Sequence, residues 1–291
     1  MKIKILLVFL SLLLSFEIIA DESEDGSNEE EAKEESKKDD RELISEFVEE
    51  FIFYEGLLKS YQDPENGNTY LELSDEDISK EFIYFAHIIN GTVEAGLFKG
   101  SHIDQAVIKF EKQFNSLNLI RVNTGFYFDP NSELSRQSQS NISDSVIENF
   151  EITHKNDDET TYLIDITKLL KSDNLTKLKS EPRDYDSDSF QVGSLSRSKT
   201  AISKIYNYPK NTDFEVDYVF SNPASYESLR NTSVKLRYTF LEMPQDNGFE
   251  IRFEDPRIGY FTDRVTDLSS TEITPYRLSL IHISEPTRHA S

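Results

Sequence analysis

The stretch Phe214-Glu215-Val216-Asp217-Tyr218-Val219-Phe220 is rich in aromatic and β-branched side chains. These residue types suit the pleated, half-buried surface of a sheet, so the stretch predicts a β-strand. Similar runs lie on either side of it, at residues 202–208 and 233–241, and both are predicted to be strands as well. Three such segments in succession indicate a β-rich fold in this half of the chain.

Short strands are also predicted elsewhere along the chain. The string Asp63-Pro64-Glu65-Asn66-Gly67-Asn68 contains an Asn-Gly pair, which is typical of a hairpin turn. Eight or more short strands with few helices predict a mainly β (β-rich α+β) domain of antiparallel sheets over residues 42–262. The further predicted strands are residues 69–73, 81–89, 106–112, 117–128, 151–154, 160–166 and 249–253.

A few short helices are predicted between the strands. Residues 42–58 carry apolar side chains at near-helical spacing, and residues 143–150 fit a short helix with Val146, Ile147 and Phe150 inward. Ser74 and Asp77 have the spacing of a helix-capping pair, and residues 167–170 fit one helical turn.

The composition narrows the classes of partner. The 291 residues have a formal net charge of -23, which argues against a nucleic-acid partner because phosphate binding needs clustered Lys and Arg. The chain contains no Cys, so we expect neither disulfides nor a thiolate metal site.

The N-terminus has the pattern of an export signal. Lys2 and Lys4 precede an apolar run over residues 5–16, and Ala20 offers a cleavage site, so residues 1–20 are predicted to be a signal peptide. A membrane anchor is the alternative, although the run is short for a span of about 20 residues. We therefore expect an exported protein, periplasmic or secreted, with no stable membrane anchor after cleavage. Residues 21–41 are acidic, almost without apolar side chains, and predicted to be a disordered linker.

The histidines do not form a zinc-hydrolase pattern. They stand at positions 87, 102, 154, 282 and 289, and no His-Glu-x-x-His string is present. His87 lies in a predicted apolar strand and is expected to be a hydrogen-bonded core residue, whereas His102 and His154 are expected to be exposed beside turns.

Other chemical motifs are incomplete. Asp184, Asp186 and Asp188 resemble the start of a calcium loop, but Ser189 and Leu195 stand where that loop needs Gly and Glu. The Gly96–Gly100 segment lacks the Lys-Ser/Thr ending of a phosphate loop. We therefore predict no catalytic, cofactor-binding or metal residue in this chain.

Several segments have a characteristic order along the chain. The most specific is Asp255-Pro256-Arg257-Ile258-Gly259-Tyr260-Phe261. The others are Glu55-Gly56-Leu57 with Tyr61, Thr69 to Leu73, Gly96 to Gly100, Val146 to Ile152, Leu163 to Thr167, Lys171 to Asp173 and Ser203 to Asn211. Taken in order, these segments resemble the N-terminal half of large bacterial zinc-dependent metalloproteases that carry a DUF5117 domain. The resemblance covers roughly residues 42 to 277.

The resemblance implies a function for a longer parent protein. In that family a metzincin-like catalytic domain with zinc follows, and its extended His-Glu-x-x-His motif is absent from this sequence. The chain is then expected to be a truncated, inactive, non-catalytic scaffold of an exported zinc metallopeptidase. Its partners would be its own missing catalytic domain and, for the full-length enzyme, a peptide or protein substrate.

The C-terminal residues fit a truncation. Residues 263–277 are expected to begin the linker to the missing domain. Residues 278–291 resemble a translated sequencing adapter and are expected to be an artefactual tail. The alternative function is a stand-alone exported β-rich module that binds a protein or glycan partner, because Tyr and Phe are plentiful and suit binding surfaces when exposed.

Overall fold

The computed structural model describes residues 43–127, 142–178, 192–221, 231–244, 262–267 and 276–279. The chain divides into residues 1–40 and 41–291, and every described residue lies in the second part. The expected signal peptide and acidic linker, the strand at 249–253, the heptapeptide 255–261 and the Asp184–Asp188 segment all lie outside the described residues. No helix in the described ranges is long and apolar enough to cross a membrane.

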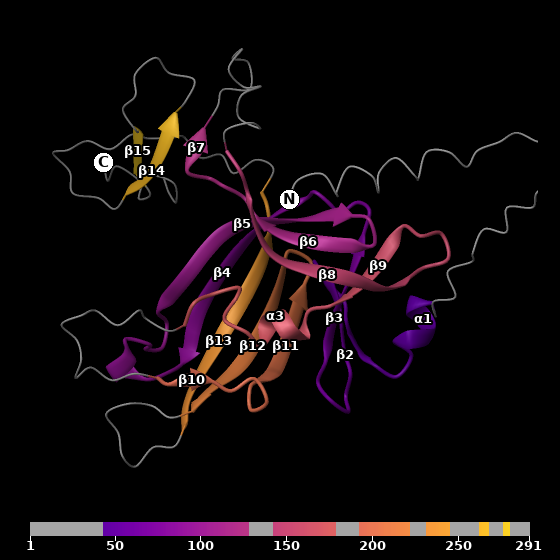
Figure 1. The fold of residues 1–291 in the computed structure, drawn as a ribbon, viewed down its shortest axis with the longest axis horizontal. Coiled ribbons are helices and arrows are strands. Elements are labelled where there is room, and N and C mark those ends of the chain that lie inside the picture. Colours follow the sequence, from indigo (N-terminus) through magenta and orange to yellow (C-terminus); the bar gives the residue numbers. More distant parts are fainter. Residues whose placement is uncertain are drawn as a thin grey trace, which may run out of the picture. The chain divides into compact units, whose positions relative to one another are not determined.

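One large antiparallel sheet dominates the fold, which confirms the predicted mainly β class (Figure 1). Its strands follow the order β1-β2-β3-β9-β8-β6-β5-β4-β13-β12, and β12 pairs with both β10 and β11. The strands are β1 (Ile52–Tyr54), β2 (Lys59–Gln62), β3 (Thr69–Ser74), β4 (Glu81–Asn90), β5 (His102–Gln113), β6 (Ser116–Arg121), β8 (Ser145–Lys155), β9 (Thr161–Asp165), β10 (Ser194–Leu195), β11 (Ala201–Tyr208), β12 (Asn211–Ser221) and β13 (Asn231–Glu242).

The predicted hairpins are present where local turn chemistry specifies them. Strands β2 and β3 pair across the Asn-Gly turn, where Gly67 has φ +73° and donates its N–H to the Asp63 carbonyl at 2.9 Å. Strands β5 and β6, and β8 and β9, also form antiparallel pairs, and β11, β12 and β13 lie side by side. These observations confirm the strand predictions in the described regions, although β6 ends at Arg121, before the predicted end at residue 128.

The predicted helix at residues 42–58 is wrong for most of its length. Only α1 (Ile44–Phe47) is helical, and β1 follows and pairs with β2. The run Phe51-Ile52-Phe53-Tyr54 prefers an extended backbone because aromatic and β-branched side chains pack well across strands. Phe53 stacks on Tyr61 with 5.0 Å between ring centroids.

The predicted helix at residues 143–150 is also wrong, since this segment begins the long strand β8. Pairing with β6 places Phe150 opposite Leu117, and both side chains are buried. Val146, expected inward, is 57% exposed. Tertiary pairing here overrides a helical spacing that the apolar residues also fit.

The Ser74–Asp77 segment closes a turn instead of starting a helix. The Asp77 carboxylate accepts hydrogen bonds from Ser74 N at 3.0 Å and Ser74 Oγ at 2.7 Å. The expected side-chain contact is therefore present, but the chain leaves the turn through Ser79 at φ 69° and enters β4.

The two ends of the large sheet are joined by hydrogen bonds, which we call the seam. Asn207 Nδ2 donates to the carbonyls of Tyr54 and Leu58 at 2.8 and 2.7 Å. Thr212 Oγ1 donates to Asn207 Oδ1 at 2.6 Å and accepts from Leu58 N at 3.0 Å. A Cβ added at Gly56 would overlap Asn207 and the backbone of Tyr208, so the seam requires glycine there. The sheet thereby closes on itself.

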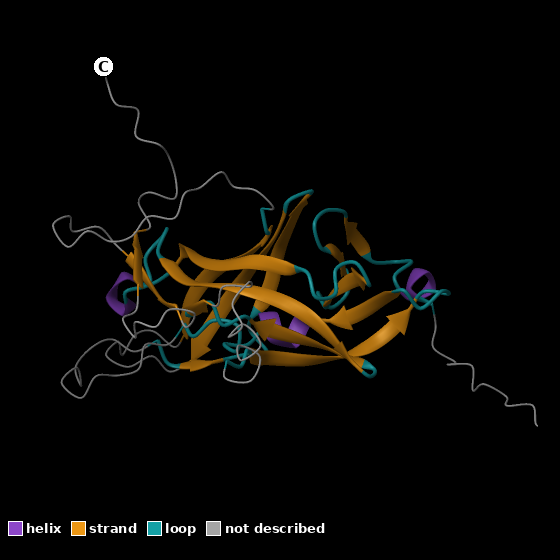
Figure 2. Cartoon of the chain, turned by 90° about the horizontal axis from the view of Figure 1, so that it is seen from above, coloured by secondary structure: helices purple, strands orange, loops and turns teal. Residues whose placement is uncertain are grey.

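The core fills the inside of this closed sheet. Helix α3 (Thr167–Leu170), which confirms the predicted helical turn, lies between the strand layers (Figure 2). Leu169 and Leu170 of this helix are 3% and 1% exposed. They belong to one apolar cluster with residues of β3, β4, β5, β6, β8, β11, β12 and β13. Such a filled interior is typical of a small barrel without a ligand cavity.

The remaining elements are short. The 3-10 helix η1 (Val93–Ala95) lies in the predicted loop between β4 and β5. A separate three-stranded sheet has the order β15-β14-β7, and its strands β14 and β15 fall in residues that the sequence indicated as linker and tail. These strands are β7 (Phe126–Tyr127), β14 (Thr262–Asp267) and β15 (Tyr276–Ser279).

Candidate functional site

The polar groups inside the barrel form a structural network. The Tyr218 hydroxyl contacts the Tyr238 hydroxyl at 2.6 Å and donates toward the carbonyls of Leu170 and Ser172. Tyr84 makes a similar contact with Thr176. Burial is the main cause that raises the pKa of Tyr218 and Tyr238 above the ordinary tyrosine value. These neutral phenols hold the segment after α3 inside the barrel.

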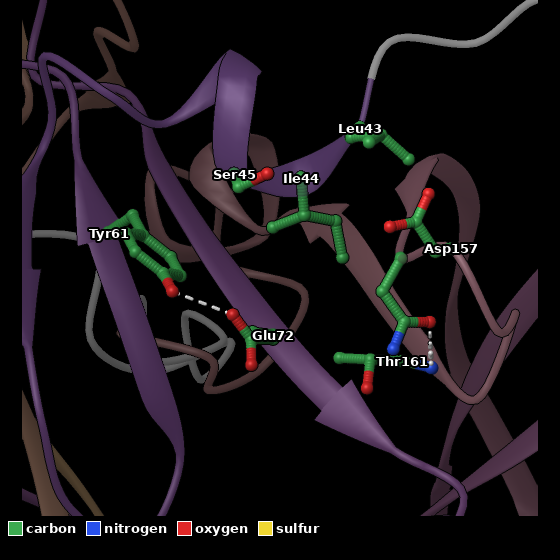
Figure 3. Close-up of a pocket in the computed structure, with 8 residues that line it drawn as sticks. Leu43, Ile44, Ser45, Tyr61, Glu72, Asp157 and Thr161 are labelled. Carbon is green, nitrogen blue, oxygen red and sulfur yellow. Dashed lines mark hydrogen bonds between the residues drawn. The ribbon is translucent and has the colours of Figure 1, made fainter.

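A first surface hollow of about 240 Å³ lies between α1, strands β2 and β3, and the turn after β8 (Figure 3). Its polar centre is Glu72, whose side chain is 13% exposed. Tyr61 Oη donates to Glu72 Oε2 at 2.6 Å, and Lys59 Nζ lies 3.0 Å from Oε1. Burial and the Glu72 carboxylate raise the pKa of the Tyr61 hydroxyl. The hollow is lined by Leu43, Ile44, Ser45, Tyr61, Glu72, Asn156, Asp157 and Thr161.

This arrangement favours a structural role for Glu72. Both of its oxygens are engaged, one by a phenol and one by an ammonium, so its charge is balanced within the fold. On the far side of the hollow, Asn156 Oδ1 accepts from Thr161 N at 2.9 Å and orders the β8–β9 turn. These contacts order the β2–β3 hairpin on one side of the hollow and the β8–β9 turn on the other.

An aromatic cluster packs α1 against strands β3 and β8. Phe47 lies 5.2 Å from Phe51 and 5.4 Å from Tyr70 between ring centroids. The imidazole of His154 stacks on Phe47 at 3.9 Å and is half-buried, so the expectation of an exposed His154 is wrong. Phe47 of α1 covers this imidazole. The contact between α1 and β8 is long-range, so the local sequence around His154 did not indicate it.

His87 differs from the expected core histidine. It is half-buried on the outer face of β4, and its Nδ1 is buried without a hydrogen-bond partner in the described part of the chain. Burial and the nearby Arg237 lower its pKa. His102 is exposed, as predicted, and pairs with His87 across β4 and β5. The two histidines are 15 positions apart in sequence, so they become neighbours only through the pairing of β4 with β5.

The surroundings of His87 form an ion-pair network. Arg237 donates from Nε to Glu215 Oε1 at 3.2 Å, and its guanidinium lies 5.2 Å from the Tyr206 ring. Glu215 is buried, with a side chain 4% exposed. Among the described residues no group of three or more His, Asp or Glu side chains could hold a metal ion.

A second surface hollow, of about 710 Å³, lies at the tip of the β5–β6 hairpin and extends onto β8. Phe114 at the tip is 92% exposed and has φ +54°. Next to it, amide and hydroxyl side chains form a hydrogen-bonded row on the outer face of the sheet. We call this surface the hairpin-tip platform; it consists of Gln113, Phe114, Asn115, Ser116, Asn118, Val146, Asn149 and Glu151.

The strand register explains why the platform residues meet. Ser116 pairs with Gln113 on β5, and Asn118 pairs with Asn149 on β8. Alternate residues Leu117 and Phe150 point inward and are buried, so their polar neighbours face outward. The predicted helix at residues 143–150 is incompatible with this site, because a helix would not bring Asn149 beside Asn118. The alternation Ser116-Leu117-Asn118-Leu119 was the signal that could have revealed it.

The fold and its surface define a closed antiparallel β domain with a filled interior. The family model described as "Domain of unknown function (DUF5117)" matches residues 100–282, more than half of the chain. The chain therefore belongs to the DUF5117 family. The searches of curated proteins and of solved structures found no match. Strands β1 to β4 precede the matched residues, yet they belong to the same sheet.

Proposed function

We propose that the chain is the non-catalytic scaffold region of an exported zinc-dependent metallopeptidase. Membership of the DUF5117 family is the observation that carries this proposal, together with the resemblance of the ordered segments to that class of protein. The filled barrel adds support for a scaffold role, because it leaves the outer faces of the sheet for a neighbouring domain or substrate.

Zinc belongs to the full-length protein in this proposal. The His87–His102 pair is a poor zinc site because Arg237 pairs with His87 across β13 and β4, and its positive charge would repel the ion. We therefore assign no catalytic step to the described residues. Zinc-bound water and a glutamate base in the missing domain would hydrolyse the peptide bond.

Peptidase assays test this proposal. We expect the purified 291-residue chain to leave casein intact, and the protein with its downstream sequence restored to hydrolyse casein until a chelator removes the metal. Chelator-sensitive hydrolysis by the 291-residue chain would contradict the scaffold role. A restored protein without hydrolysis at any zinc concentration would contradict the peptidase assignment.

The downstream sequence can be established at the locus. We propose that the string from Leu278 to Arg288 is translated adapter and that the natural protein continues beyond Arg277. The family match ends at residue 282, inside this string. The position at which the natural coding sequence stops therefore has to be established by sequencing the gene. Long reads should show an open frame into a catalytic domain, and a native stop codon after Ser291 would contradict the truncation.

Export is tested by the mature N-terminus. Cleavage after Ala20 predicts a periplasmic or secreted protein that begins at Asp21. Mass spectrometry of the protein from cell fractions should find this terminus outside the cytoplasm, and an uncleaved cytoplasmic chain would contradict the localisation.

The stand-alone binding module predicts a different behaviour. A fragment of residues 42–262 that is soluble, monomeric and shifted in melting by a ligand would favour it. A fragment that aggregates alone and becomes soluble with the downstream domain restored would favour the scaffold.

A further inference from the structure

We propose that the hairpin-tip platform is a binding site for a neutral oligosaccharide. This inference goes beyond the scaffold role, because it holds whether or not a catalytic domain follows. It rests on three features of the platform: an exposed aromatic ring, a directional row of amides and the size of the hollow.

The aromatic feature is Phe114. Its side chain is 92% exposed, and its backbone has φ +54°, a region that bulky side chains rarely adopt. Glycine or asparagine would be more favourable at such a turn position. Folding alone therefore does not explain a phenylalanine here, whereas a ring held in solvent can stack on the C–H face of a sugar ring.

The polar feature is the row of amides. Asn118 Nδ2 donates to Gln113 Oε1 at 3.0 Å, and Asn149 Nδ2 donates to Asn118 Oδ1 at 2.6 Å. Asn149 Nδ2 also donates to Ser116 Oγ at 2.9 Å. All the bonds run in one direction, so the row leaves donor N–H groups at Gln113 and an acceptor oxygen at Asn149.

The donor groups of Gln113 and the acceptor oxygen of Asn149 suit two neighbouring hydroxyls of a sugar. Each hydroxyl of a sugar both donates and accepts, so adjacent hydroxyls can meet a donor and an acceptor on one row. Because the row is exposed, its bonds compete with water and add little stability. They do hold the amides in fixed orientations, which lowers the ordering cost of binding.

Size and charge identify the class of ligand. The hollow of about 710 Å³ is shallow and open to solvent, and its volume lies within the range of small-molecule sites. Seven of the eight platform side chains are uncharged, Glu151 is the one carboxylate among them, and the adjacent Glu111 is paired with Lys109 at 2.8 Å. The Glu151 carboxylate would repel an anionic glycan, so a neutral hexose oligosaccharide fits these features better.

A tryptophan reporter tests the proposal directly. The chain contains no Trp, so Phe114→Trp in the full chain places a single indole on the platform. We expect a saturable emission shift when maltotriose, cellotriose or chitotriose is added. No response to any of the three trisaccharides, by fluorescence or by calorimetry on the unaltered chain, would overturn the proposal. A response to casein peptides alone would assign the platform to peptide binding instead.

Variants separate binding from folding. For the trisaccharide that binds, calorimetry should show that Phe114→Gly weakens affinity about tenfold or more, with an unchanged or higher unfolding midpoint. Phe114→Tyr should retain binding, and Asn149→Ala should weaken it. Phe98→Ala alters another exposed aromatic, 54% exposed in the β4–β5 loop, and should leave affinity unchanged. Equal affinity in Phe114→Gly and the unaltered chain would place the sugar elsewhere and overturn the assignment.

Discussion

The seam and the hairpin-tip platform use the same chemistry in opposite surroundings. At the seam, the half-buried amide of Asn207 joins the two ends of the sheet through four hydrogen bonds, counting those that pass through Thr212. At the platform, the amides of Asn118 and Asn149 bond to each other on an exposed face. Amide bonds shielded from water should stabilise the fold, and exposed ones should arrange a surface for binding.

The largest effect is expected at the seam. Asn207→Ala removes the donor to the carbonyls of Tyr54 and Leu58 and should lower the free energy of unfolding by about 2–4 kcal/mol. Chemical denaturation of the variant and the unaltered chain measures this loss. Asn118→Ala on the exposed row is the matched control. Equal losses in the two variants would end the distinction between seam and platform.

The buried tyrosine network should rank second. Tyr218→Phe leaves the carbonyls of Leu170 and Ser172 without this donor and should cost about 1–3 kcal/mol of unfolding free energy. Tyr208→Phe alters a tyrosine that is 51% exposed and should leave stability unchanged in the same denaturation experiment. An unchanged free energy of unfolding in Tyr218→Phe would mean that the network does not hold the α3 segment.

Alkaline pH provides a third comparison. The folded-state pKa of Tyr218 is raised above the ordinary value of 10.0, so above pH 10 the unfolded chain releases its proton first. Stability is then fully present below pH 10 and falls as pH rises through the folded-state pKa. Tyr218→Phe should reduce the slope of this fall by about 1.4 kcal/mol per pH unit. Denaturation series at stepwise higher pH measure both slopes, and identical slopes would contradict a buried neutral Tyr218.

The smallest effect on stability is expected at the platform. Asn149→Ala should change the unfolding free energy by less than about 0.5 kcal/mol, because its amide bonds lie on an exposed surface. Thermal and chemical unfolding of this variant check the value. A loss as large as that of Asn207→Ala would show that the platform row is structural.

Local turn chemistry explains what the sequence predicted correctly. The Asn66-Gly67 pair specifies the β2–β3 turn, and the α3 turn begins where Asp165 Oδ1 accepts from Thr167 N at 2.8 Å. Residues 143–150 were wrongly predicted to be a helix because Val146, Ile147 and Phe150 fit one helical face. Phe150 and Ile152 also fit the inward face of a strand, and both are buried. The partner strand decided between these two patterns, and a partner is not visible in a local window.

The candidate sites were harder to predict for the same reason. The seam joins Asn207 to Tyr54, which are 153 residues apart in sequence. The platform combines the β5–β6 tip with Asn149 of β8, and it exists only if β8 is a strand. Each site depends on a register that long-range pairing sets.

The pairing of β4 with β13 also constrains the order in which the protein can mature. β4 is an early strand with Phe82, Tyr84 and Ile88 buried, and one of its two neighbours is made only when residues 231–242 have been synthesised. Until then its edge is an unpaired template for other chains. Such distant pairing is typical of domains that fold slowly, in about milliseconds to seconds. The nascent chain must therefore be kept from self-association until nearly the whole barrel sequence has emerged.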